Sequence, residues 1–307
     1  MSSTSALLDH AEPKKKKPSS AMAGERRGIS GFLGKLPLNL VLVVFCVIWL
    51  VPTVGLLVSS FRPATAISNS GWWRAFTPPL GFTLDNYIHV ITQQNMGTAF
   101  LNSIAIAVPA TIMPILIAAF AGYTLAWLNF PGKTGVFLVV VGLLVVPIQM
   151  TLIPVLRLFN YFKLTGTYPG VWLAHTAYGM PFAVYLLRNY IGDLPRSLFE
   201  VARIDGADNF TIFYRLIIPL SVPAIASLSI FQFMWAWNDL LVALIYLGGF
   251  PNVAPLTVAI SGLVNSYGQG WQYLTAAAFV SMALPFAVFF SMQRYFVRGI
   301  LAGSVKG

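Results

Sequence analysis

Hydrophobic residues in this chain gather in long stretches without charge, not in the short periodic patterns of a soluble core. The first stretch has 23 residues, 36–58, and a helix needs about 20 residues to cross the hydrocarbon core of a bilayer. The six stretches lie at residues 36–58, 98–128, 136–156, 170–187, 216–247 and 273–293. This pattern predicts an all-α, polytopic membrane protein with six transmembrane helices.

The second and fifth stretches are longer than a straight crossing requires. We therefore expect them to tilt or kink. Prolines mark the expected kinks, because proline has no backbone N–H to donate within a helix. Pro109 and Pro114 lie in the second stretch, and Pro219 and Pro223 lie in the fifth, which Asp239 also interrupts.

Composition supports the membrane interpretation. Hydrophobic residues make up 57% of the chain and charged residues only 9%, whereas about 25% charged residues are usual in a soluble domain. A cleaved signal peptide is the alternative for the first stretch. Signal peptides have apolar cores of roughly 7–15 residues, and this stretch is longer, so we predict an uncleaved first span.

The net charge of +10 comes from lysines and arginines that lie between the apolar stretches and at the ends of the chain. If the N-terminus is inside, fifteen of the nineteen fall on the inner side, as the positive-inside rule requires. This pattern predicts a plasma (inner) membrane protein with both termini cytoplasmic, in contact with membrane lipid and without a nucleic-acid partner. The predicted parts are a basic tail at 1–35, a transmembrane domain at 36–299 and a C-terminal tail at 300–307.

Four of the nine acidic residues fall in one predicted cytoplasmic segment, residues 192–215. Pro195 suits the first turn of a helix, and Gly206 suits its end, because glycine enters the left-handed conformation freely. Asp208 or Asn209 can cap a second helix that leads into the fifth span. The segment therefore predicts a short helix–turn–helix on the inner face. A plain solvated connector is the alternative, but it would need neither helix.

The same segment carries a recognisable motif. It reads Glu200-x-Ala202-x-x-Asp205-Gly206-Ala207, followed by Phe213 and by Ile217-x-Pro219. This motif resembles the EAA loop of ABC importer permeases, with Val201 in place of an alanine. Further similarity to carbohydrate-uptake permeases of the maltose-permease type lies in Thr83–Tyr87, Trp235–Asp239, Gln293–Gly299 and the final residues Ala302–Gly307.

The resemblance implies a type I ABC importer permease for sugars, with an oligo- or disaccharide as the expected cargo. The implied partners are a second homologous permease subunit, two cytoplasmic ATPase subunits and an external sugar-binding protein. The chain itself would be no enzyme and would need no cofactor, because the partner subunit hydrolyses ATP. The residues implied to couple to the ATPase are Glu200, Ala202, Asp205, Gly206 and Ala207, and those implied to reach it from the C-terminal tail are Gly303, Lys306 and Gly307.

Asp239 is the only acidic residue within a predicted span. A charge at mid-membrane costs roughly 2.5–3.5 kcal/mol on insertion scales, so it should face a partner or a water-filled interior. Trp235, Trp237 and Asn238 lie beside it, and together these four side chains could line a sugar pathway. The alternatives are a structural hydrogen bond or a place near the outer interface.

Other functions stay open at this level. A secondary transporter would work without an ATPase, but it commonly shows internal repeats and several ionisable residues at mid-membrane. An ABC permease for a non-sugar solute would share the coupling motif, and a membrane anchor would need neither Asp239 nor kinked spans. Gly132-Lys133-Thr134 lacks the upstream glycine of a phosphate loop. The histidines lack metal-ligand spacing, so no metal site is predicted; they are His10, His89 and His175.

Overall fold

The computed structural model describes residues 26–78, 81–263 and 269–304, and these residues form helices and connecting turns without a strand. The chain divides into two units, residues 1–54 and 55–307. The helices are α1 (Arg26–Ser60), α2 (Ala64–Asn69), the 3₁₀ helix η1 (Trp72–Phe76), α3 (Asp85–Gln93), α4 (Met96–Trp127), α5 (Lys133–Leu143), α6 (Ile148–Tyr161), α7 (Tyr168–Gly192), α8 (Arg196–Ile204), α9 (Asn209–Ile212), the π-helix η2 (Phe213–Ile217), α10 (Ile218–Trp237), α11 (Leu241–Leu247), α12 (Leu256–Ser261) and α13 (Trp271–Ser304).

Within the described residues, four helical segments are long and apolar enough to cross a membrane. They are Pro37–Ser60, Met96–Trp127, Asn209–Trp237 and Trp271–Ser291, and the bent pair α5–α6 is a fifth if it counts as one span. The 25-residue helix α7 covers the predicted stretch 170–187, although it is not among these candidates. The helical multi-pass architecture is therefore confirmed, and the count of six spans stays a prediction.

The third predicted span is not one straight helix. Residues 136–156 divide between α5 and α6, whose axes are bent by 102°. The break falls before Pro147, whose backbone is extended with ψ of 129°. Proline cannot donate to the carbonyl of Leu143 in the preceding turn, and it disfavours helical geometry in the residue before it. The apolar run continues across the break, which is why hydrophobicity alone predicted a single span.

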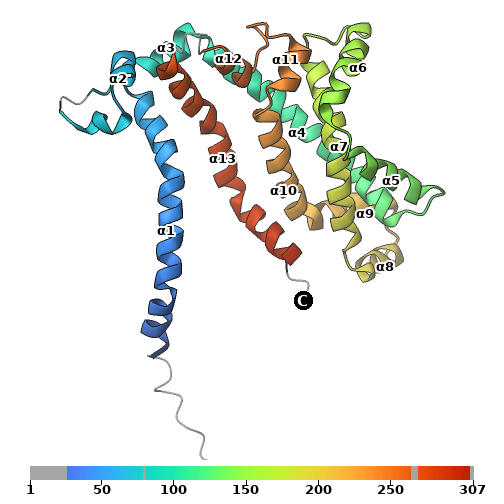
Figure 1. Ribbon diagram of the computed structural model, residues 1–307. Helices are drawn as coiled ribbons and strands as arrows, with labels where there is room; N and C mark the ends of the chain where they lie inside the picture. Colours follow the sequence, from blue (N-terminus) through green and yellow to red (C-terminus); the bar gives the residue numbers. More distant parts are fainter. Residues whose placement is uncertain (1–25, 79–80, 264–268, 305–307) are drawn as a thin grey trace, which may run out of the picture. The chain divides into compact units, whose positions relative to one another are not determined.

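The core of the second unit lies where α4 packs along α7, and α10 packs against α4, α7 and α13. Figure 1 shows α10 between α13 and α7. Small residues let these backbones approach closely: Ala107, Ala110 and Ala118 of α4 are fully buried. Gly122 faces α7 so closely that a β-carbon there would lie 3.0 Å from the backbone nitrogen of Arg188.

A side chain from a neighbouring helix satisfies the carbonyl that Pro109 leaves without a partner. In an α-helix the N–H of residue 109 would donate to the oxygen of Ala105, but proline has no N–H. The indole nitrogen of Trp172 on α7 donates to that oxygen instead, at 2.9 Å. The position of Pro109 in α4 is thereby tied to α7.

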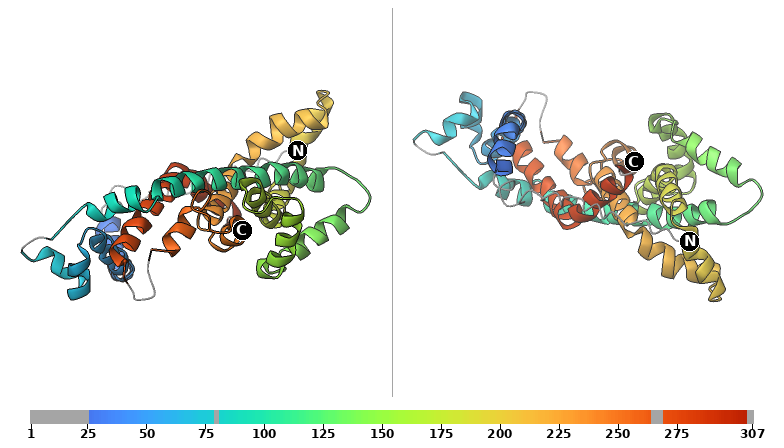
Figure 2. Two further views of the ribbon diagram at one scale, coloured as in Figure 1. Left: turned by 90° about the horizontal axis from the view of Figure 1, so that it is seen from above. Right: turned by 90° about the horizontal axis from the view of Figure 1, so that it is seen from below.

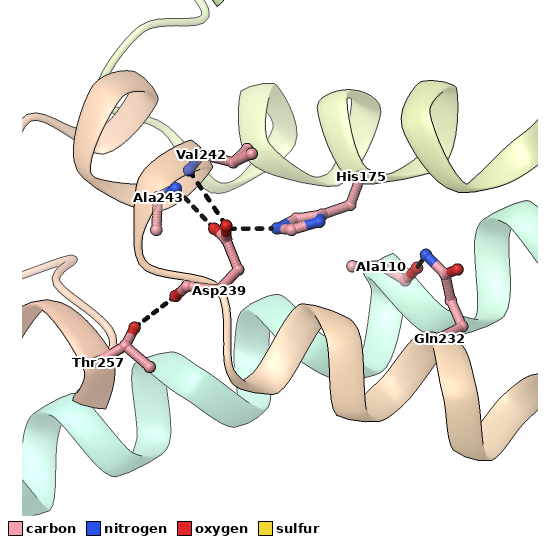
Figure 3. A network of polar contacts seen from close by, with 7 residues as sticks. All are labelled: Ala110, His175, Gln232, Asp239, Val242, Ala243 and Thr257. Carbon is pink, nitrogen blue, oxygen red and sulfur yellow. Dashed lines mark hydrogen bonds and ion pairs between the residues drawn. The ribbon is translucent and has the colours of Figure 1, made fainter. Parts of the chain in front are cut away.

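Pro114 leaves a second carbonyl of α4 without a partner, and α10 supplies the donor. The amide nitrogen of Gln232 donates to Ala110 O at 3.2 Å, as Figure 3 shows. Gly179 of α7 makes room for this side chain, since a β-carbon there would lie 2.6 Å from the Gln232 amide nitrogen. One buried amide therefore joins α4 and α10 at a position where α7 has no side chain.

The same arrangement occurs once more, between α10 and α13. Pro285 leaves the carbonyl of Ser281 free, and the indole nitrogen of Trp237 donates to it at 3.1 Å. We call Trp172, Gln232 and Trp237 the carbonyl-capping side chains. A backbone carbonyl without a donor is unfavourable in hydrocarbon, so these three contacts allow the prolines to remain inside buried helices.

The loop between α11 and α12 folds back onto the N-terminal part of α4. The amide nitrogen of Asn102 donates to the carbonyl of Ala254 at 3.0 Å, and the hydroxyl of Tyr168 donates to the Asn102 side-chain oxygen at 2.8 Å. The hydroxyl of Ser103 accepts from the backbone of Leu256 at 2.8 Å. This loop belongs to the stretch 248–272 without a charged residue, and neutral side chains hold it in place.

Candidate functional site

The segment that carries the sequence motif forms the predicted helix–turn–helix. Helix α8 begins at Arg196, directly after Pro195, which has an extended backbone with ψ of 129°. Pro195 therefore stands just before the first turn, one position earlier than predicted. Figure 2 shows the part of the chain that holds α8 and α9 (yellow) projecting from the helices of this unit in both views.

The turn after α8 is a Schellman motif, and residues of the sequence motif Glu200–Ala207 form it. The N–H of Ala207 donates to Ala202 O at 2.9 Å, and the N–H of Gly206 donates to Arg203 O at 3.0 Å. These are the two hydrogen bonds that define the motif. Gly206 has a φ of +81°, so the prediction that this glycine ends the helix in the left-handed conformation is confirmed.

The remaining motif residues divide between core and surface. Ala202 and Ala207 are half-buried against the core that includes Phe199 and Ile212, which agrees with the apolar contact expected across a Schellman turn. Glu200 and Asp205 are exposed. The two alanines therefore hold the turn against the bundle, and the two acidic residues stand on its outer side.

Asp208 caps the next helix, as predicted. Its carboxylate accepts the backbone N–H of Thr211 at 2.9 Å. Hydrogen bonds from the Thr211 side chain and backbone hold the pKa of Asp208 below its ordinary value, because they stabilise the charged form. The cap gives α9 a fixed start close behind the glycine turn.

Aromatic contacts anchor both ends of this segment to α4. Phe199 of α8 is buried and stacks on Trp127 at 3.7 Å between ring centroids. Phe213, the first residue of η2, stacks on Phe120 at 4.2 Å and lies 5.7 Å from Tyr123. Packed rings therefore connect α8 and η2 to the C-terminal part of α4. The sequence motif contained Phe213, but Trp127 and Phe199 were not predicted.

The exposed surface of the segment also carries large apolar side chains. Ile204 is 84% exposed and Phe210 is 67% exposed, and Leu198 and Val201 are exposed as well. We call these four residues the outer knuckle face. A monomeric soluble surface rarely gathers such side chains on so short a segment without a partner.

A second polar cluster lies at the break between α10 and α11, where Asp239 interrupts the fifth predicted span. Its carboxylate accepts the backbone N–H groups of Val242 at 3.1 Å and Ala243 at 2.8 Å, so it caps the start of α11. The Asp239 carbonyl accepts the hydroxyl of Thr257. Figure 3 shows these contacts together with His175 of α7, whose Nε2 lies 3.6 Å from the carboxylate.

His175 is fully buried, and neither ring nitrogen has a hydrogen-bond partner among the described residues. Its ring packs edge-on against Trp235 at 4.9 Å. Sequence reasoning did not connect His175 with Asp239, because the two lie on different helices and no fixed spacing signals their contact.

The other predicted pathway residues differ in exposure. Trp237 is 3% exposed, and its indole nitrogen already caps Ser281 O. Trp235 is half-buried and Asn238 is exposed. Asp239 keeps 10% of its side chain exposed. The four neighbours in sequence therefore do not share one surface of this chain.

The predicted tail contacts fall at the edge of the structure. Gly303 belongs to the last turn of α13. Lys306 and Gly307 lie outside the described residues.

Apolar helices long enough to span a membrane, together with a short capped helix–turn–helix, define this chain as a polytopic membrane protein. The chain belongs to the family of binding-protein-dependent transport system inner membrane components, whose family model matches residues 114–302.

Two relatives and one solved structure are similar over most of the chain. The osmoprotective compounds uptake permease protein GgtD of Synechocystis sp. is 57% identical over 90% of this chain and 93% of its own length. The alpha-glucoside transport system permease protein AglG of Rhizobium meliloti is 55% identical over 77% of this chain and 63% of its own length. A crystal structure of a bacterial ABC transporter involved in the import of the acidic polysaccharide alginate contains a chain with a TM-score of 0.70. That match covers 90% of this chain and 99% of the other at 20% identity, and it shows the shared fold.

Proposed function

We propose that this chain is one transmembrane permease subunit of an ATP-binding-cassette importer for sugars or glycosides. The observation that carries the proposal is the Schellman turn at Ala202–Ala207, which presents an apolar face on a projecting helix. The family match and the similarity to AglG, named for alpha-glucoside transport, support the importer and its substrate class. A second permease subunit, two ATPase subunits and an external sugar-binding protein complete the proposed complex.

The proposed orientation has both termini and the segment 192–215 on the cytoplasmic side. The excess of lysine and arginine on that side supports it. A helix that projects from the inner face with an exposed apolar surface suits a cleft on a cytoplasmic ATPase subunit. In this proposal Gly206, Ala202 and Ala207 shape the turn, and Glu200 and Asp205 supply polar contacts at its rim.

The coupling step in this proposal is a movement of α8. When the ATPase pair closes on ATP, it displaces the outer knuckle face, and the stacked rings of Phe199 and Trp127 carry the displacement to α4. Since α4 packs along α7 and α10, the three helices move together and change which side of the membrane the interior opens to. Hydrolysis of ATP in the partner subunit then resets the complex.

Among the residues near the α10–α11 break, we assign Trp237 and Asp239 a structural role, because their polar atoms already serve the backbone. Trp235 remains our candidate for contact with the solute in the assembled pathway. Asn238 remains one through its side-chain oxygen, since its amide nitrogen donates to Met234 O at 2.8 Å. The tail residues Gly303, Lys306 and Gly307 are proposed to reach the ATPase pair. Removal of 303–307 should then weaken sugar-stimulated hydrolysis.

A second candidate cargo is an osmoprotective compound, which the 57% identity to GgtD favours. A test is uptake into cells that lack the chromosomal copy and carry this chain on a plasmid, with labelled α-linked disaccharide and labelled osmoprotectant offered separately. We expect ATP-dependent disaccharide uptake that also needs the external binding protein. If only the osmoprotectant is taken up, the substrate class is osmoprotective compounds and not sugars. Uptake driven by an ion gradient without ATP would indicate a secondary transporter and contradict the proposal.

A further inference from the structure

A cationic pocket lies between α8 and the turn that joins α4 to α5. Its volume is about 420 Å³. Three basic side chains from two parts of the chain line it, with one acidic side chain: Lys133, Arg196, Arg203 and Glu200. Trp127 and Phe199 also line it, and they are stacked on each other. The pocket thus combines a net positive charge with an aromatic wall.

The pocket and the outer knuckle face lie on different sides of α8. At 100° per residue, Arg196, Glu200 and Arg203 project within about 60° of one another. Val201 and Leu198 project on the opposite side, and their side chains are exposed. Glu200 lies at the edge of the pocket nearest Ile204, about 40° from it around the helix, where it can also meet the ATPase subunit. The pocket leaves Leu198 and Val201 of the outer knuckle face free for that subunit in the proposed complex.

The basic groups of the pocket have capacity left for an anion. Among the described residues, Arg196 and Arg203 take part in no ion pair, although Glu200 lies one turn from each. The ammonium of Lys133 donates to Ala126 O and Leu128 O, each at 3.0 Å. An ammonium has three N–H donors, so one remains for a ligand, and both guanidinium forks match a phosphate group.

The surroundings of the pocket match a membrane interface. Trp127 is the last residue of a helix apolar enough to span the membrane, and tryptophan is enriched where spans meet the headgroups. Helix α5 starts at Lys133 and carries exposed apolar side chains, among them Leu138 and Val139. A ligand with a phosphate at Lys133 and hydrocarbon along α5 would find complementary surface for both parts.

We infer that this pocket binds the phosphate of an anionic phospholipid headgroup from the inner leaflet. The inference rests on the proposed orientation of the chain, because basic pockets on the cytoplasmic side are where such headgroups bind. A bound headgroup bridges α8 and the α4–α5 turn. It therefore holds the projecting helix in the position from which the ATPase moves it.

The test measures lipid association directly, without ATP or sugar, so that its failure is separate from failure of the proposed function. The intact transporter complex is placed in lipid discs of phosphatidylcholine with spin-labelled phosphatidylglycerol as the minor component, and the bound fraction is measured. Arg196→Gln, Arg203→Gln and Lys133→Gln are compared with Arg215→Gln, an exposed residue of the same segment outside the pocket.

We expect each of the three pocket variants to weaken phosphatidylglycerol association by about fivefold, and Arg215→Gln to leave it near the wild-type value. Lys133 lies on another element than the two arginines, so a disturbance of α8 alone cannot produce all three losses. Equal weakening by Arg215→Gln would indicate general surface attraction and overturn the inference, as would wild type without preference for phosphatidylglycerol. Displacement of the labelled lipid by millimolar inorganic phosphate would assign the pocket to a soluble phosphate compound and overturn the lipid assignment.

Discussion

The turn between α8 and α9 and the interior formed by α4, α7, α10 and α13 both contain backbone that departs from a regular helix. In the turn, residues within six positions of one another satisfy the freed groups, through the hydrogen bonds from Gly206 and Ala207. In the interior, the carbonyls freed by Pro109, Pro114 and Pro285 are satisfied by side chains of other helices. The turn is therefore a local unit, whereas each interior proline depends on the packing around it.

This difference suggests a division of mechanical roles. A local turn keeps its shape when the segment moves as a body, as the proposed coupling requires. The carbonyl-capping side chains join α4 to α7, α4 to α10 and α10 to α13. If one helix of a pair slides along the other, a buried hydrogen bond is lost, so α4, α7 and α10 are expected to move together. The predictions below test the two halves of this comparison, from the largest expected effect to the smallest.

If the turn is a local unit, Gly206 is required for its left-handed backbone conformation and not for its small size. A β-carbon at Gly206 would meet nothing within 4 Å, and the same holds for Gly135 of α5, but only Gly206 has positive φ. Gly206→Ala should cost about 1–2 kcal/mol, and Gly135→Ala should be neutral or stabilising by about 0.5–1 kcal/mol. Hydrogen exchange at the amide of residue 207 should accelerate about five- to thirtyfold in the first variant only. Equal exchange in both variants would refute the local account.

If the interior prolines depend on side chains of other helices, the loss of stability caused by removing Gln232 should depend on Pro114. Gln232→Leu leaves the Ala110 carbonyl unpaired and should destabilise the protein by about 1 kcal/mol. In Pro114→Ala the N–H of residue 114 can donate to that carbonyl, so Gln232→Leu on this background should cost little. Unfolding of all four proteins in detergent completes the double-mutant cycle. Additive losses would mean that this hydrogen bond does not compensate for the N–H that Pro114 lacks.

A third prediction concerns Asp239 at the α10–α11 break, which joins a local cap to a long-range contact with His175. Asp239→Ala should destabilise the protein by about 0.5–1 kcal/mol through loss of the cap. Asp239→Asn keeps a capping oxygen and should cost less. With the structural role that we assign, the asparagine variant transports sugar with unchanged KM. A clearly raised KM at normal stability would place Asp239 on the pathway instead.

The smallest expected effect is a pH dependence from Asp208. Its pKa is lowered in the folded protein by the hydrogen bonds from Thr211. The cap therefore contributes stability above the unfolded pKa of about 3.9, and this contribution is lost as the pH falls through the lowered folded pKa. Asp208→Asn should remove this acid sensitivity and keep a capping oxygen. Hydrogen exchange at the Thr211 amide, followed from neutral to acidic pH, measures the stability of this cap. If exchange in Asp208→Asn accelerates at acidic pH as in wild type, the acid sensitivity does not come from Asp208.

Local features of this chain could be predicted from its sequence because a few neighbouring residues determine them. Gly206, the Asp208 cap and the interruption at Asp239 are confirmed by the backbone. The third span was predicted wrongly as a single helix, because hydrophobicity passes through Pro147 without change. The partners of Ala105 O and Ala110 O could not be predicted, since pairing a proline with a distant tryptophan or glutamine requires the helix packing itself.

The same limit applies to the candidate site. The motif predicted the turn, but not the rings of Trp127 and Phe199 that anchor it. Lys133, which a phosphate-loop comparison excluded from nucleotide binding, lines a pocket with Arg196 and Arg203 that lie more than sixty positions away. These contacts between distant residues result from the packing of α4 along α7, which the spacing of residues in the sequence does not predict.

The most direct test of the proposed coupling is ATP hydrolysis by the complex that co-purifies with an affinity-tagged chain, compared at equal membrane expression for wild type, Gly135→Ala and Gly206→Pro. Proline fixes φ near −65°, which is incompatible with the +81° observed at Gly206. We predict that ATPase activity accompanies wild type and Gly135→Ala and falls at least tenfold, as an order-of-magnitude estimate, with Gly206→Pro, because the turn that presents α8 is lost. Full activity with Gly206→Pro, or no ATPase with a well-folded wild-type chain, would contradict the account.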